Sequence, residues 1–217
     1  MKDAILIILI CILLAVSWHA NAGEVTVFGG PNHSTDQGMG TWWQSGYPYV
    51  EKLNSYTLGI RYDECRGGWC LGSGIVTHGH VSVSSLDDPN DLDYRLPINQ
   101  RQYKPSHYNG GGGTWGFFTA VGKQFGAVTA EVGVSLLKPS WTVNVPDGHF
   151  SPGPDCPAQN ITVSHRSHLQ PGLVAGLRYR LTNKVSVELS AWQTASHGDE
   201  WVSLYKRTYA FTVGYSF

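Results

Sequence analysis

The sequence predicts an all-β chain in which eight antiparallel strands, joined up and down in sequence order, close into a transmembrane barrel. Three observations predict it: apolar residues alternate with small or polar ones along many segments, the connections are alternately long and short, and an export signal comes first. Charged residues make up 14% of the 217 residues, against ~25% in soluble domains. Lipid is therefore the expected surrounding of one strand face.

The N-terminus has the three parts of a cleaved signal peptide. Lys2 gives a positive start, Ala4–Val16 is apolar, and Ala20–Ala22 offers small residues for cleavage. The apolar run is shorter than the ~20 residues that a spanning helix needs, and no later run reaches that length. We expect residues 1–22 to be a signal peptide and residues 23–217 to form one barrel domain.

The clearest strand is Tyr209–Phe217, in which every odd-numbered residue is apolar and every even-numbered one is small or polar. Period two gives a strand one apolar face and one polar face. Two segments follow the rule less cleanly, because Ile75 and Val76, and likewise Phe117 and Phe118, are adjacent. The eight predicted strands are Glu24–Gly29, Tyr56–Tyr62, Leu71–Val81, Thr114–Gln124, Val128–Leu136, Leu173–Leu181, Val185–Ala191 and Tyr209–Phe217.

The connections fall into two classes of length that alternate along the chain. A bacterial outer-membrane barrel with both termini in the periplasm has long extracellular loops at odd-numbered connections and short periplasmic turns at even ones. The long connections are Gly30–Asn54, Ser82–Gly113, Lys138–Gln170 and Ser196–Lys206, and the short ones are Asp63–Trp69, Phe125–Ala127 and Thr182–Lys184. Aromatic residues predicted at the outer strand ends are Trp115, Trp141, Trp192 and Trp201.

These features together resemble the small outer-membrane β-barrel proteins, the OmpA/OmpX-like group. The resemblance covers Gly23–Phe217 as a pattern and ends on an aromatic residue, Phe217. It implies a monomeric barrel in a Gram-negative outer membrane, in contact with lipid and lipopolysaccharide. It also implies that the barrel-assembly machinery reads Phe217 as its signal.

Charged residues on the polar strand faces are expected inside the barrel. Eight strands leave an interior just wide enough for side chains, and an unpaired ion there costs several kcal/mol, so these groups must pair. We expect a plug of ion pairs that blocks conduction, with a narrow pore as the alternative. The expected network consists of Arg61, Lys123, Glu131, Arg178, Arg180 and Glu188.

Three cysteines follow the signal peptide. Export permits a disulfide, and Cys65 and Cys70 enclose only a short turn, so we predict a bond between them. This leaves Cys156 unassigned. His78 and His80 have the spacing of a shared strand face, but no third ligand accompanies them, so no metal site is predicted.

A lipid A-modifying acyl hydrolase is the alternative function. The lipid A deacylases, which are more distantly similar barrels, carry a His-x-Ser pair facing outward on their seventh strand. The matching positions here are Ala191, Gln193 and Ala195, so that pair is missing. Two other groups keep an esterase open as the alternative, since a hydroxyl and an imidazole lie close in sequence in each: His165 with Ser167, and Ser196 with His197 and Glu200.

We predict a non-enzymatic barrel whose surface loops serve envelope structure or contact with a host, a phage or another surface. The segment Gly30–Asn54 combines aromatic with small residues, a composition that suits contact with an extracellular ligand. The net charge of -1 excludes a polyanion such as nucleic acid as a partner. No cofactor is expected.

Overall fold

The computed structural model describes residues 23–35, 49–85, 109–148, 159–166, 169–194 and 207–217. All regular structure in these residues is β-strand. None of these residues forms a helix with the length and apolarity needed to span a membrane. The strands are β1 (Glu24–Thr35), β2 (Tyr49–Lys52), β3 (Asn54–Arg66), β4 (Trp69–Ser85), β5 (Asn109–Phe125), β6 (Val128–Gly148), β7 (Gln159–Arg166), β8 (Gln170–Arg180), β9 (Val185–Thr194) and β10 (Arg207–Ser216).

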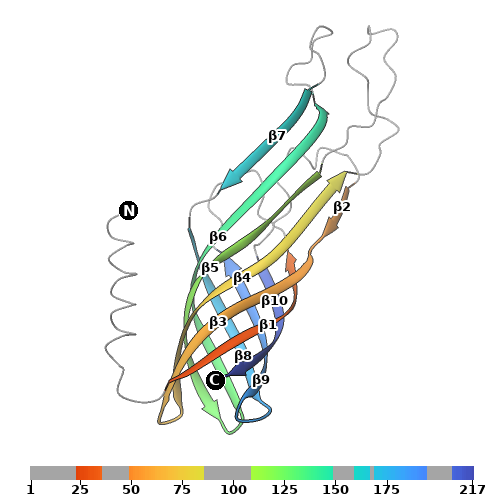
Figure 1. Ribbon diagram of the computed structural model, residues 1–217. Coiled ribbons are helices and arrows are strands. Elements are labelled where there is room, and N and C mark those ends of the chain that lie inside the picture. Colours follow the sequence, from red (N-terminus) through yellow and green to blue (C-terminus); the bar gives the residue numbers. More distant parts are fainter. Residues whose placement is uncertain (1–22, 36–48, 86–108, 149–158, 167–168, 195–206) are drawn as a thin grey trace, which may run out of the picture.

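The strands form one closed antiparallel sheet (Figure 1). Around the barrel the strands pair in the order β1, β3, β4, β5, β6, β8, β9 and β10, and the first strand closes on the last through Thr26↔Ser216 to Thr35↔Arg207. Strands β2 and β3 follow one another along the same position of the barrel, and β7 and β8 do the same beside β6. The ten strands therefore make eight barrel positions, and the predicted fold class is confirmed.

Several strands run further toward the outer end than the alternation predicts. Strand β1 continues to Thr35, β4 to Ser85 and β6 to Gly148, while β5 starts at Asn109. The sequence assigned these residues to loops. Backbone pairing does not require alternation of side chains and continues through segments such as Gly110–Gly113 of β5, so the predicted boundaries are wrong there.

Beyond the barrel rim, five strands continue as an open sheet (Figure 1). We call this extension, β2–β4–β5–β6–β7, the outer sheet. Its longest hairpin pairs Ser140–Gly148 with Gln159–Arg166. Among the described residues, β7 pairs only with β6 and β2 only with β4. The outer sheet thus has two edges, which the closed barrel below it lacks.

The inner end of the barrel has tight turns. Gly67 and Gly68 take positive φ values of 58° and 77° between β3 and β4, and Gly126 takes 62° between β5 and β6. Glycine adopts this conformation without the steric cost that a Cβ would bring. In the third turn, Thr182 Oγ1 accepts hydrogen bonds from the backbone N–H groups of Lys184 and Val185, at 3.2 and 3.0 Å.

The outward strand faces form a continuous apolar belt. Val132 is 67% exposed and Leu173 63% exposed, and the other large apolar side chains of this face resemble them. A monomer in water rarely exposes so large an apolar surface, and closure of the sheet leaves no second layer to cover it. Hydrocarbon is the solvent that fits the belt, since closure also satisfies every backbone group of the spanning strands.

The inward face is closely packed, which gives a test of the register. A Cβ added at Gly133 would collide with the backbone carbonyl of Thr119 and with Ala120. We expect Gly133→Val to destabilise the barrel by about 3 kcal/mol, since the neighbouring backbone cannot yield. Urea unfolding in detergent micelles, followed by tryptophan fluorescence, measures this. The control Val132→Ile changes the adjacent outward residue, and equal unfolding midpoints for both variants would contradict the register.

Candidate functional site

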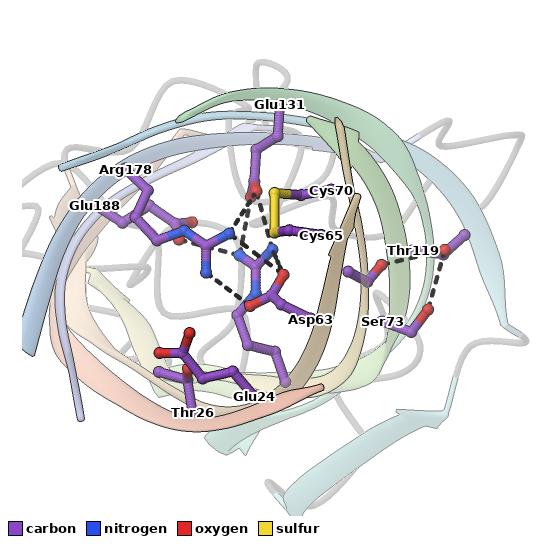
Figure 2. A network of polar contacts seen from close by, with 12 residues as sticks. Glu24, Thr26, Asp63, Cys65, Cys70, Ser73, Thr119, Glu131, Arg178 and Glu188 are labelled. Atoms are coloured by element: carbon purple, nitrogen blue, oxygen red, sulfur yellow. Dashed lines mark hydrogen bonds and ion pairs between the residues drawn. A yellow bond between two sulfur atoms is a disulfide. The ribbon is translucent and has the colours of Figure 1, made fainter. Parts of the chain in front are cut away.

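The interior of the barrel holds a network of buried charges (Figure 2). Inward positions along each strand alternate with the lipid-facing ones, and five charged residues at such positions, on four strands, form one connected group of ion pairs. These residues, which we call the ion network, are Arg61 and Asp63 on β3, Glu131 on β6, Arg178 on β8 and Glu188 on β9.

Arg61 lies at the centre of the ion network and is 3% exposed. Its two terminal nitrogens donate to both carboxylate oxygens of Glu131 at 2.9 Å. They also donate to Asp63 Oδ1 at 2.8 Å and to Glu188 Oε2 at 3.1 Å. The fork geometry of the guanidinium permits this, because it offers several donors in one plane. One side chain therefore ties three strands together across the lumen.

Arg178 supplies the second cation. Its guanidinium donates to the two carboxylate oxygens of Asp63 at 2.7 and 3.3 Å, and a further ion pair of 3.6 Å reaches Glu131. Two arginines thus face three carboxylates. The attraction within such a cluster offsets the cost of removing each ion from water only if all are present together.

An aromatic layer lies against the ion network. Phe118 meets Phe28 edge to face with 6.3 Å between ring centroids, and Trp192 with 5.3 Å. All three are buried, with exposures of 8%, 6% and 3% for Phe28, Phe118 and Trp192. The Arg61 guanidinium carbon lies 5.6 Å from the Phe118 centroid, within cation–π range. Trp192 lies near the outer end of β9 as predicted, but it points into the lumen and not toward lipid.

A row of polar side chains continues beyond the aromatic layer. Asn32 Nδ2 donates to Thr57 Oγ1 at 2.9 Å, and that hydroxyl lies 2.9 Å from His78 Nδ1. The His78 ring stands edge to face on Trp192, with centroids 5.1 Å apart. Apolar and polar layers thus follow one another along the barrel axis, each held by contacts between strands far apart in sequence.

Four of the six charged residues predicted for the interior join the ion network: Arg61, Glu131, Arg178 and Glu188. Asp63 also belongs to the ion network, although the sequence pattern predicts a turn there. Strand β3 continues through Arg66, so Asp63 lies two residues from Arg61 on the same face. The sequence does contain a signal for Asp63: an acidic residue two positions from a buried arginine lies on the same strand face and can pair with it.

Lys123 and Arg180 lie outside the ion network. Lys123 pairs with Trp69 across β4 and β5, and its Nζ lies 4.8 Å from that indole's centroid. Of the adjacent residues Phe117 and Phe118 on β5, Phe118 points inward. Even-numbered residues of this strand therefore face the lumen, and Lys123 faces the outer surface. Arg180 is on the inner rim, 3.4 Å from Glu24 and 47% exposed. The predicted interior position is therefore wrong for Lys123, whereas Arg180 pairs with Glu24 at the inner mouth of the barrel and not with the ion network.

Cys65 and Cys70 form a disulfide between opposed residues of β3 and β4. Figure 2 shows it beside the ion network. Cys156 lies outside the described residues. His78 and His80 do not share a face, because a bulge shifts the register between His78 and Val81 and leaves His80 exposed.

The residues of the hydrolase alternative are mostly outside the described part of the chain. His165 lies on β7, where its backbone pairs with Trp141. Ser167, Ser196, His197 and Glu200 fall in the segments that the structure does not describe. Among the described residues, no three His, Cys, Asp or Glu side chains are grouped so that they could hold a metal ion.

The ion network makes Arg61 the residue whose loss should cost most. In Arg61→Met, three carboxylates keep one cation, so we expect a loss of about 3–5 kcal/mol of stability. Arg180→Met is the control, because its side chain is 47% exposed and that of its partner Glu24 is 34% exposed, and pairs near the surface contribute at most about 1 kcal/mol. Urea midpoints in detergent measure both. Similar midpoints for the two variants would contradict the central role of Arg61.

No protein-family model matches the sequence, and no curated protein matches it. Solved structures do match. A major outer membrane protein from Thermus thermophilus has a TM-score of 0.50 at 12% identity, over 91% of this chain and 100% of that one. Ail of Yersinia pestis has 0.49 at 12%, over 90% and 97%, and OprG of Pseudomonas aeruginosa has 0.46 at 12%, over 90% and 96%. This chain has the fold of the small outer-membrane β-barrels.

Proposed function

We propose that the protein is a non-conducting outer-membrane barrel that presents its outer sheet and loops for contact with other surfaces. The observation that carries this proposal is the combination of a filled lumen with an open, two-edged outer sheet. A filled lumen argues against transport through the barrel. An exposed sheet edge offers unpaired backbone groups to a partner.

The lumen is filled by two successive layers. The ion network crosses it between β3, β6, β8 and β9, and the aromatic layer adds rings from β1, β5 and β9. The barrels that conduct freely have more strands and a wider interior. An ion entering here would have to displace Arg61 from three carboxylates, which supports a closed barrel over the pore alternative.

The outer sheet supplies the contact surface. Its hairpin β6–β7 projects furthest (Figure 1), and β7 pairs on one side only among the described residues. A partner with an extended segment can add a strand at such an edge, with affinity from the backbone and specificity from alternate side chains. The favoured partner is therefore a protein with an exposed strand, on another cell or on a coated surface.

Conductance tests the closed barrel. The purified protein in a planar bilayer should give no steady current, because the ion network and the aromatic layer cross the lumen. Phe118→Ala combined with Trp192→Ala removes two rings of the aromatic layer and should still give none, since the ion network remains. A steady open-channel current from the unaltered protein would overturn the proposal in favour of a pore.

Attachment of cells tests the outer sheet. A shortened variant joins Ser140 to Leu169 through a tight turn, which removes the β6–β7 hairpin and leaves the β6–β8 pairing of Val128–Leu137 intact. Cells that display the full protein should aggregate and attach to protein-coated plastic, and cells with the shortened variant should not.

A matched control replaces the same residues with a Gly–Ser segment of equal length, which keeps the loop length and removes the strand. It should behave like the shortened variant, because the proposal needs the sheet edge. Gel mobility before and after heating shows that each variant is a folded barrel. If all variants attach as well as the unaltered protein, the outer sheet is not the contact surface.

A further inference from the structure

One part of the apolar belt is hollowed. On β8 and β9, Ala175 and Ala191 face each other directly across the strand pair, and Ala130 on β6 lies one step further toward the inner end, opposite Leu177. All three point outward, where most of the belt carries Val, Leu or an aromatic ring. We call this stretch of short side chains the alanine lane.

Tall side chains border the alanine lane. Leu173 is 63%, Leu177 56% and Leu189 60% exposed, and the Tyr209 ring closes the end on β10, opposite Ala191. Two hollows, of about 770 and 390 Å³, meet over Ala175, Ala191 and Tyr209. The lane is therefore a groove one side chain deep in a wall that is otherwise convex.

Polar side chains lie beside both hollows: His33 and Asn54 line the larger one, and a cation lines the smaller one. The smaller hollow is lined by Gln193 and Arg207, which pair across β9 and β10 one step outside Ala191 and Tyr209. Arg207 is exposed and is the first residue of β10 at the barrel rim. From there the lane continues toward the inner end over apolar residues. A groove with a cation at its interfacial end and hydrocarbon walls matches one ligand chemistry, a lipid with an anionic headgroup.

The length of the lane agrees with this occupant. From Arg207 to Ala130 it crosses three strand spacings, about 14 Å at ~4.8 Å each. It also moves four residues along β6, from Val134 in the row of Arg207 to Ala130, which adds about 13 Å at ~3.3 Å each, so the whole path is on the order of 20 Å. With Arg207 in the headgroup region, a path of this length reaches the centre of a ~30 Å hydrocarbon core. An acyl chain lying in the lane would thus end near the bilayer centre with its headgroup phosphate at Arg207, where a guanidinium can bind two phosphate oxygens.

We propose that the alanine lane is a binding site for a phosphate-bearing lipid of the outer leaflet, with one acyl chain over Ala175 and Ala191 and the phosphate at Arg207. The proposal depends on the membrane location of the barrel and not on the outer sheet. Its failure would therefore leave the contact function untouched, and the reverse holds as well.

Binding to the purified barrel in mild detergent tests the site. The probes are lipopolysaccharide and the same lipopolysaccharide after enzymatic removal of its phosphates, with bound lipid counted by native mass spectrometry. The unaltered protein should retain the phosphorylated probe preferentially. Arg207→Gln should weaken that binding about tenfold, the usual scale for a lost charge-assisted contact, and should bind both probes alike.

A second variant fills the lane. Ala175→Leu with Ala191→Leu should lose both probes, because the acyl chain has no groove. The matched controls are Val187→Leu, which enlarges an outward residue of β9 beyond the lane, and Lys184→Gln, which removes a cation at the inner end. Both controls should bind like the unaltered protein. If the filled variant does not fold, the Arg207→Gln result decides alone.

Three results would overturn the site. Equal binding of both probes to the unaltered protein would mean that Arg207 selects no phosphate. Equal losses in the filled variant and in Val187→Leu would mean that the lane is ordinary lipid-facing surface. A dimer that disappears only in the filled variant would assign the lane to a second copy of this chain.

Discussion

Pairing of every backbone group inside hydrocarbon is the constraint on which the rest of this structure depends. A β-strand in lipid has no water to satisfy its N–H and C=O groups, so the sheet must close. Here the pairing of β1 with β10 provides that closure. Once the sheet is closed, each strand has one face toward lipid and one toward a narrow interior, and the residue pattern follows from this division.

The narrow interior imposes the second condition, that its polar groups satisfy one another. Arg61 meets it by binding Asp63, Glu131 and Glu188 from three strands. The ion network therefore holds together strands that are not neighbours in the sheet. The aromatic layer of Phe28, Phe118 and Trp192 adds packing of the kind that a soluble core would have. A lumen built in this way stabilises the barrel and at the same time obstructs it.

The sequence was sufficient to predict the fold, because alternation of apolar and polar residues indicates which face of each strand contacts lipid. It was less informative where adjacent residues are both apolar or where a strand is interrupted by a bulge. Because Phe117 and Phe118 are adjacent, the pattern does not show which residues of β5 face inward. Lys123 was therefore predicted on the wrong face. The bulge after His78 separated two histidines that simple parity places together. Both errors arise because parity assumes an unbroken strand with one obvious apolar face.

The outer sheet escaped prediction for a different physical reason. Pairing of its strands does not require alternation of side chains, and Gly110–Gly113 reads as a loop although it lies within β5. The sequence alone also does not reveal the alanine lane. Ala130, Ala175 and Ala191 are far apart in sequence, and only the register between β6, β8 and β9 places them together. Such sites are determined by pairing between strands and not by any single segment.

The disulfide also affects how strands β3 and β4 can align. Cys65 and Cys70 are directly opposed, so their bond fixes which residue faces which along the whole hairpin. If β3 slid by one position relative to its neighbours, its side chains would exchange faces, and the guanidinium of Arg61 would be driven into the lipid tails. The disulfide thus opposes a shift in register between β3 and β4. It lies on the strand whose shift would bring the charge of Arg61 into hydrocarbon.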